Sequence, residues 1–210
     1  MSALIFDLDG TLSDSLPLIV EASQGALAEA GVTVSRDRII SYIGFPLVDT
    51  GELLLGSGRG QEYFDLYQKH YHASDKKLMA FPGIVEMLQA LKLAGHQVAI
   101  ATSKKELSAM ESLAQIGVVS LLDAVVTVDS ACGIKPGPGP ALKAMALLQA
   151  SPERSLFVGD SLHDLRCAKA AGVAFVGVTW GACSKEQLLL AEADYIAEDV
   201  AELTRILADF

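Results

Sequence analysis

Short runs of apolar residues alternate with amphipathic stretches over most of this chain. The runs are bounded by polar or turn-forming residues, which is typical of strands buried on both faces of a sheet. In the stretches between them, apolar residues recur at helical spacing, which predicts helices packed against that sheet. The expected strands are Ala3–Phe6, Gln97–Ala101, Ala124–Val128, Leu156–Val158, Phe175–Val178 and the short Tyr195–Ile196.

Strands and helices alternate from residue 81 onward, an order that predicts a parallel, doubly wound α/β sheet of Rossmann-like type. Pro82-Gly83 opens the first of these helices, and Gly95 follows its end. The later helices are expected to begin at about Lys104 or Lys105, at residue 138, at Leu162, at Ser184 and after the last short strand.

Residues 15–80 show no alternation of period two, so no strand is predicted there. Apolar positions fit one helical face from Leu16 until Gly31 stops the helix. Further helices are expected at Arg38–Ile43, Thr50–Leu55 and Glu62–His72. We therefore expect two domains: an α/β core of residues 1–14 and 81–210, and an all-helical insertion of residues 15–80.

The composition fits a chain with an ample hydrophobic core. Of the 210 residues, 51% are apolar. No uninterrupted apolar run approaches the roughly 18 residues of a membrane-spanning helix, so no membrane partner is expected. The first strand begins close to the N-terminus, without a basic segment followed by a long apolar run. We therefore expect no secretory signal and a cytoplasmic location.

Cysteine content and net charge argue against several further kinds of site and partner. Cys132, Cys167 and Cys183 form an odd, irregularly spaced set that favours free thiols over disulfides or a zinc site. The formal net charge of −10 argues against nucleic acids and anionic membrane surfaces as partners.

Two aspartates separated by one residue, Asp7 and Asp9, directly follow the first predicted strand. Carboxylates at the mouth of a buried strand are costly unless a cation shares the site. Beside a metal, one carboxylate can act as nucleophile while the other carries a proton. Gly10 permits a sharp turn, and Thr11 adds a hydroxyl. The alternative is a strand followed by a simple aspartate-rich turn.

Three more polar groups follow later strands. Because the carboxyl ends of parallel strands share one edge of a sheet, we expect these groups near Asp7. Each also has a structural interpretation, since Thr102 or Asp160 can cap the next helix and Lys135 can be an exposed loop residue. The groups are Thr102-Ser103, Lys135-Pro136 and the segment Gly159-Asp160-Ser161-Leu162-His163-Asp164.

In this order, the acid pair, the hydroxyl, the lysine and the second acid pair resemble the haloacid dehalogenase superfamily of phosphotransferases, over essentially the whole chain. The resemblance implies that Asp7 is a nucleophile that forms an aspartyl-phosphate. It implies that Asp9 protonates the leaving oxygen and then activates water. The presence of Asp9 favours a phosphatase or phosphomutase over a dehalogenase. The helical insertion resembles the cap that covers the active site in this family.

By the same resemblance, Mg²⁺ is the expected cofactor. Its ligands are the Asp7 side chain, the backbone carbonyl of Asp9 and the Asp160 side chain. Asp164 either contacts the metal ligands without binding the metal itself or is an alternate ligand. It lies on the same helix face as Asp160.

The resemblance also implies a phosphate-binding set. Lys135 pairs with Asp7 and with the phosphoryl oxygens. The Thr102 hydroxyl and the backbone amides of Leu8 and Ser103 donate hydrogen bonds to the same oxygens. A divalent metal and Lys135 would supply the local cations that an acidic phosphate-binding protein needs.

Within the superfamily, Asp9–Ser15, Tyr42–Leu47 and Ala193–Tyr195 resemble phosphoglycolate phosphatase-like members. We expect a hydrolase of a small phosphorylated metabolite, either a monomer or a dimer. A β-phosphoglucomutase-like phosphosugar mutase is an alternative, although mutases carry an arginine where this chain has Pro46. A nucleotidase or a pyrophosphatase is another.

A substrate carboxylate would require a cationic group in the cap, although exposed charges are usually solvated. His163 and Trp180 are expected to serve in packing rather than in catalysis. The candidates for the cationic group are Arg36, Arg38, Arg59 and Lys69.

Overall fold

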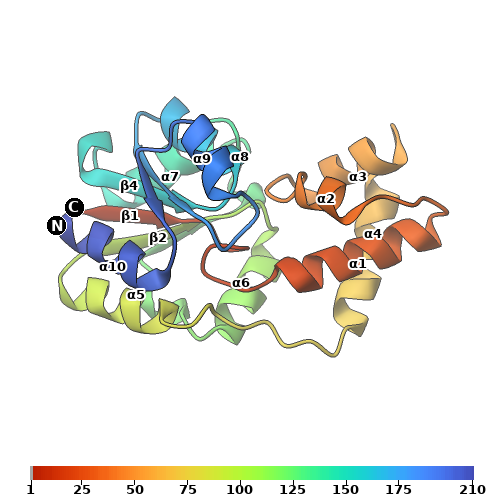
Figure 1. The fold of residues 1–210 in the computed structure, drawn as a ribbon, viewed down its shortest axis with the longest axis horizontal. Helices are drawn as coiled ribbons and strands as arrows, with labels where there is room; N and C mark the ends of the chain where they lie inside the picture. The colour runs from red at the N-terminus through yellow and green to blue at the C-terminus, as the bar shows by residue number, and fades with distance from the viewer. Residues whose placement is uncertain (1) are drawn as a thin grey trace.

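The computed structural model describes residues 2–210. All six strands pair in parallel in one sheet, in the order β3-β2-β1-β4-β5-β6 (Figure 1). β1 lies inside the sheet, between β2 and β4, so the carboxyl ends of these three strands are neighbours. The predicted doubly wound α/β fold is confirmed. The strands are β1 (Ala3–Phe6), β2 (Gln97–Ala101), β3 (Ala124–Val126), β4 (Ser155–Gly159), β5 (Ala174–Val178) and β6 (Tyr195–Ala197).

Two layers of helices cover the sheet. Leu4 and Phe6 of β1 pack on one face with α5, α6 and α10, whereas Ala3 and Ile5 pack on the other with α7, α8 and α9. This alternation explains why β1 is apolar throughout, because both of its faces are buried. The helices are α5 (Ile84–Leu93), α6 (Glu106–Gln115), α7 (Gly139–Leu148), α8 (Leu162–Ala170), α9 (Lys185–Leu190) and α10 (Val200–Asp209); the 3₁₀ turns are η1 (Val119–Leu121), η2 (Val128–Ser130) and η3 (Pro152–Arg154).

Four helices between β1 and β2 form a bundle that we call the cap bundle. It lies beside the sheet, to its right in Figure 1, and has a hydrophobic cluster of its own. Gly51 and Gly60 let two of its helices approach closely, since a Cβ on Gly51 would lie 2.8 Å from Gly60 Cα. We keep a domain division at residues 14 and 80 as a proposal. The helices are α1 (Leu16–Glu29), α2 (Arg36–Ile40), α3 (Leu47–Leu55) and α4 (Gly60–Ala73).

Some predicted boundaries of strands and helices are wrong, and for β3 and α2 the reason is local. β3 ends at Val126 because the following residues form η2, where the Thr127 side chain and Ser130 make a capping box. α2 begins at Arg36, where Ser35 Oγ accepts a hydrogen bond from Arg38 N, and ends at Ile40. α6 begins at Glu106, just after the expected Lys104 or Lys105, and α3 begins at Leu47 rather than at Thr50.

Two features of composition can be compared with the fold. Cys132, Cys167 and Cys183 are free, and the last two are buried. Among residues 2–210, each helix is too short or too polar to cross a lipid bilayer.

Candidate active site

The sheet brings the predicted chemical groups to one edge. Asp7 directly follows β1, Thr102 follows β2, and Asp160 follows β4. Since β2, β1 and β4 are neighbours in parallel, these three residues lie side by side beyond the carboxyl ends of the strands. Lys135 comes from the loop between η2 and α7, far away in the chain.

Lys135 is buried between two carboxylates. Its ammonium nitrogen lies 2.8 Å from Asp7 Oδ1 and 2.7 Å from Asp164 Oδ1, and its side chain is 1% exposed. Burial lowers the pKa of Lys135, but the charges of Asp164 and Asp7 outweigh this effect and raise it. Lys135 is therefore held as a cation beside Asp7, and the exposed-loop interpretation is wrong.

Asp160 is fully buried and held from two sides. Its Oδ1 accepts a hydrogen bond from the Thr11 hydroxyl at 3.2 Å, and its Oδ2 accepts one from the backbone N–H of Ala182 at 2.7 Å. Gly181 leaves the space for this carboxylate, since a Cβ there would lie 2.2 Å from Asp160 Oδ2. The alternative that Asp160 caps α8 is wrong, because Ser161 is the N-cap residue.

Asp164 is engaged at both oxygens. While Oδ1 pairs with Lys135, Oδ2 accepts hydrogen bonds from the hydroxyl and the backbone N–H of Ser161, at 2.5 and 3.1 Å. These bonds form the capping box of α8. The first turn of the helix thus orients Asp164 toward Lys135.

Asp7, Asp160 and Asp164 form a cluster that fits a hard divalent cation. One oxygen of each lies within 4.8 Å of the others, and all three residues are buried. Burial raises the pKa of Asp7 to about 7, with Lys135 opposing this shift and the negative charges of Asp164 and Asp9 adding to it. Burial also raises the pKa of Asp160. A divalent cation would relieve this repulsion, and carboxylate oxygens are ligands that Mg²⁺ prefers.

Asp9 lies at the border between the sheet and the cap bundle, and it has a partner that was not expected from the sequence. The ammonium nitrogen of Lys104 lies 3.1 Å from Asp9 Oδ1 and 5.5 Å from the centre of the Tyr71 ring. Burial lowers the pKa of Lys104, but Asp9 more than compensates, so the pKa is raised. Lys104 directly follows Thr102-Ser103, just past the end of β2. This position is the sequence signal that could have identified Lys104 as a site residue.

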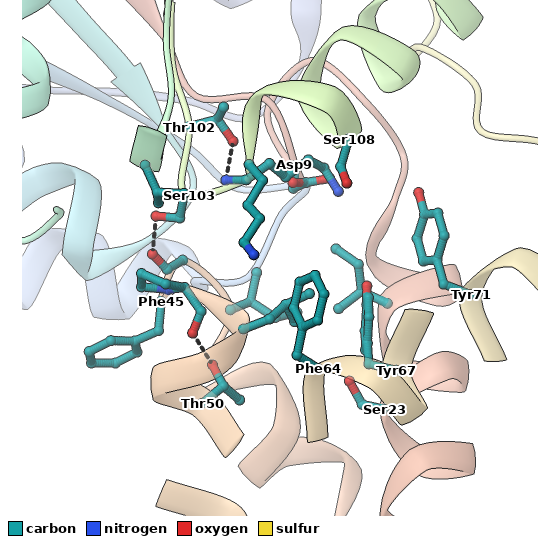
Figure 2. A pocket seen from close by; sticks show the side chains of 18 of the residues that line it. Asp9, Ser23, Phe45, Thr50, Phe64, Tyr67, Tyr71, Thr102, Ser103 and Ser108 are labelled. Atoms are coloured by element: carbon teal, nitrogen blue, oxygen red, sulfur yellow. Dashed lines mark hydrogen bonds and ion pairs between the residues drawn. The ribbon is translucent and has the colours of Figure 1, made fainter. Parts of the chain in front are cut away.

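Of the predicted phosphate-binding residues, Thr102, Ser103 and Lys135 line one cavity together with Asp7 and Asp9. Thr102 Oγ1 accepts a hydrogen bond from the backbone N–H of Lys104 at 3.2 Å, so it caps locally as well. Ser103 uses its hydroxyl to reach Gly44 in the cap bundle (Figure 2). Within residues 2–210, the backbone N–H groups of Leu8 and Ser103 have no hydrogen-bond acceptor. They therefore remain as donors for a bound anion.

A cavity of about 440 Å³ opens between these groups and the cap bundle. Asp7, Asp9, Thr102 and Lys135 line its inner end, and aromatic side chains of the cap bundle line the opposite wall (Figure 2). Its volume lies within the roughly 300–1,000 Å³ of pockets for small organic ligands.

The remaining candidates lie outside the chemical centre. His163 packs edge-on against Phe45, with ring centres 4.1 Å apart, and Trp180 Nε1 donates a hydrogen bond to the Thr11 carbonyl at 3.2 Å. Both therefore pack, as expected. The four cationic candidates Arg36, Arg38, Arg59 and Lys69 do not line the cavity.

Comparisons with known proteins agree with this geometry. Residues 4–178 match the family described as "Haloacid dehalogenase-like hydrolase". The chain is 32% identical over 209 residues to "Pyrophosphatase PpaX" of Anoxybacillus flavithermus, covering 99% of this chain and 97% of that protein. It is 36% identical over 208 residues to "Probable phosphatase IndB" of Dickeya dadantii, covering 95% and 90%.

One solved structure extends the similarity to three dimensions. The crystal structure of a "predicted phosphoglycolate phosphatase" from Haemophilus somnus 129pt has a TM-score of 0.85 and 26% identity, covering 98% of this chain and 97% of that one.

Proposed function

This chain belongs to the haloacid dehalogenase-like hydrolase family, and from that premise we propose that it is a Mg²⁺-dependent phosphomonoesterase that works through an aspartyl-phosphate on Asp7. The observation that carries the proposal is the position of Asp7. Its carboxylate lies at the carboxyl end of β1, 2.8 Å from the Lys135 ammonium and beside the buried Asp160. This arrangement suits a nucleophile that must meet an anionic phosphate.

In the first step an oxygen of Asp7 attacks phosphorus, and the bond between phosphorus and the leaving oxygen breaks. Asp9 in its acid form gives its proton to that oxygen, so the product leaves as an alcohol. In the second step Asp9 takes a proton from water, the water oxygen attacks phosphorus, and the bond to Asp7 breaks. Inorganic phosphate leaves, and both carboxyl groups return to their initial forms.

The phosphate oxygens need cations and donors in both steps. Lys135 lies beside Asp7 as a buried cation. The backbone N–H groups of Leu8 and Ser103 would donate hydrogen bonds to the phosphate oxygens. The Thr102 hydroxyl completes this set. When bound, Mg²⁺ would be held by the side chains of Asp7 and Asp160 and the Asp9 carbonyl, and it would reduce the repulsion between Asp7 and phosphate.

We propose that Asp164 is a positioning residue rather than a metal ligand. Both of its oxygens are already in contact with Lys135 or Ser161. Its role is then to keep Lys135 next to Asp7.

The experiment measures free phosphate released from a panel of phosphometabolites with Mg²⁺, with excess EDTA, and by the Asp7→Asn variant. We expect release with Mg²⁺ only, and none by Asp7→Asn. The control is Asp75→Asn, which changes an exposed aspartate outside the cavity and retains activity. Release by Asp7→Asn, or unchanged release in EDTA, would refute the proposal.

Two alternatives give different results in the same panel. Pyrophosphate is a second candidate substrate because a relative bears the name pyrophosphatase, and its hydrolysis would release two phosphates per molecule. A phosphosugar mutase would convert sugar phosphates while releasing little phosphate. Pro46 stands where mutases carry an arginine, so we favour hydrolysis.

A further inference from the structure

The cap wall of the cavity carries no lysine, arginine, aspartate or glutamate among residues 2–210. The cations that were candidates for this wall are engaged elsewhere. Arg59 pairs with Glu62 at 2.6 Å, and Lys69 pairs with Glu29 at 2.7 Å. Among the described cap residues that line the cavity, His72 is then the one group that could become a cation facing a second anionic group on a substrate.

Cations at the inner end of the cavity are largely committed as well. Lys135 lies between Asp7 and Asp164, and Lys104 pairs with Asp9. The third lysine, Lys105, is exposed, and its ammonium lies 4.4 Å from the centre of the Phe64 ring. Paired positive charge thus lies where the phosphoryl group would bind, whereas at the opposite wall the Lys105 ammonium lies over the Phe64 ring.

That opposite wall is aromatic instead. Four of the five tyrosines of the chain line the cavity, together with two phenylalanines. Tyr67 and Tyr71 stack with ring centres 5.6 Å apart and an angle of 26° between the rings. Such faces attract flat rings by stacking. The six residues are Tyr42, Phe45, Tyr63, Phe64, Tyr67 and Tyr71.

Tyr67 adds a polar group that has no partner in the protein. Its side chain lines the cavity, the residue is 4% exposed, and its hydroxyl has no hydrogen-bond partner among residues 2–210. Its neighbour Tyr63, by contrast, donates a hydrogen bond to Ser23 at 2.9 Å. In Figure 2 the Tyr67 hydroxyl points from α4 toward the side of Asp9 and Ser108. Because Tyr67 lines the cavity, a molecule bound there can accept a hydrogen bond from this hydroxyl.

We propose that the substrate is a phosphomonoester whose alcohol carries a flat, uncharged heteroaromatic ring, as nucleoside 5′-monophosphates do. The ring lies against Phe64 and Tyr71, and Tyr67 donates a hydrogen bond to an acceptor on the leaving group. This inference rests on the proposed phosphatase function and names its substrate class. It disfavours 2-phosphoglycolate and pyrophosphate, because neither carries a flat ring that could lie against the aromatic wall.

The test compares substrates that share one leaving oxygen. Uridine 5′-monophosphate, adenosine 5′-monophosphate and ribose 5-phosphate are esters of the same primary hydroxyl and differ in the base. We expect kcat/KM for the better nucleotide to exceed that for ribose 5-phosphate by about tenfold, which is within the range of base stacking. 2-Phosphoglycolate and pyrophosphate are included, and we expect both to be poorer than that nucleotide.

A ratio below about threefold lies under the weak end of base stacking, which is about 1 kcal/mol or about fivefold, and it would overturn the inference. A preference for 2-phosphoglycolate or pyrophosphate would do the same, and both results leave the phosphatase intact. If no compound in the panel releases phosphate with Mg²⁺, the proposed function fails and the inference fails with it. The two failures are therefore distinguishable.

Variants locate the preference on the cap wall. Phe64→Leu keeps an apolar side chain but removes the ring, and Tyr67→Phe removes only the hydroxyl. We expect each to reduce the nucleotide-to-ribose 5-phosphate ratio by about fivefold. Tyr195→Leu is the matched control, because this fifth tyrosine is exposed on β6 and lies outside the cavity. An unchanged ratio in both variants, or an equal reduction in the control, contradicts the assignment.

Discussion

Gly10 and Asp160 approach so closely that a Cβ on residue 10 would lie 2.2 Å from Asp160 Oδ2. Gly10 also has a φ of +78°, a backbone conformation that residues with side chains rarely adopt. The turn after Asp7 and Asp9 thus fits against the second acidic pair only because residue 10 lacks a side chain.

Gly10→Ala should displace Asp160 and reduce phosphate release by about 100-fold, since small misplacements in a catalytic site have effects of that size. Gly31→Ala is a matched control, because Gly31 has a φ of +76° but open space around its Cβ position. The control should lose about 1 kcal/mol of stability from backbone strain and keep its activity. Thermal unfolding and phosphate release measure both effects. Equal activities of the two variants would contradict the prediction.

Lys135→Met should affect both stability and turnover. It leaves the buried carboxylates of Asp7 and Asp164 without their cation, and loss of one partner of a buried ion pair destabilises by about 3–5 kcal/mol. We expect a lower melting temperature without metal, partial recovery with Mg²⁺, and a loss of turnover of about 10²- to 10³-fold. Lys143→Met, which changes an exposed lysine on α7, should behave like the wild type. Wild-type stability of Lys135→Met without metal would refute the structural role.

Stability of the metal-free protein should fall as the pH rises. Burial raises the pKa of Asp7 from 3.8 to about 7, so between these values the unfolded chain is ionised at this position while the folded protein retains its proton. The folded state then binds more protons, and the free energy of unfolding decreases from pH 4 to about pH 7 through this group.

Because Mg²⁺ binds the ionised carboxylates, it should raise the melting temperature more at pH 8 than at pH 5.5. Differential scanning calorimetry with Mg²⁺ and with EDTA at both pH values measures this. In the Asp7→Asn variant without metal, the free energy of unfolding should decrease less between about pH 4 and pH 7 than it does in the wild type. Equal Mg²⁺-induced shifts at the two pH values would count against a metal site at these residues.

Ser103→Ala should weaken the contact between the sheet and the cap bundle. Ser103 donates a hydrogen bond of 2.5 Å to the Gly44 carbonyl, whereas its backbone N–H is unaffected by the substitution. The loss of one hydrogen bond should raise KM by about 2- to 10-fold, with a smaller change in kcat. Steady-state kinetics test this, with Ser120→Ala in the exposed η1 turn as control. A fall in kcat with unchanged KM would show that the hydroxyl acts in chemistry instead.

Most of the fold could be predicted from hydrophobic periodicity. The six strands lie where apolar runs were identified, because strands buried on both faces must be apolar along their length. The errors occur at element ends, such as Val126 and Arg36, where single capping hydrogen bonds set the boundary. Short side chains that cap one turn leave little trace in a periodic pattern.

Part of the candidate site also follows from local sequence. Asp7, Thr102 and Asp160 each stand directly after an apolar run, and a parallel sheet brings such positions to one edge. The contacts of Lys104 with Tyr71 and of Ser103 with Gly44 could not be predicted in this way. They depend on where the cap bundle lies relative to the sheet, and no residue pattern encodes that distance.

The amino-acid sequence alone thus determined the kinds of chemical groups and the strand ends that carry them, because both are local properties. Only the tertiary structure decided that Lys135, 128 residues from Asp7, is buried beside it rather than exposed in a loop. It also decided that the cap wall is aromatic and carries no lysine, arginine, aspartate or glutamate among residues 2–210, since Arg59 and Lys69 are paired elsewhere and Arg36 and Arg38 lie outside the cavity. The physical reason is that burial and pairing of charges depend on the packing of distant segments, which local sequence does not specify.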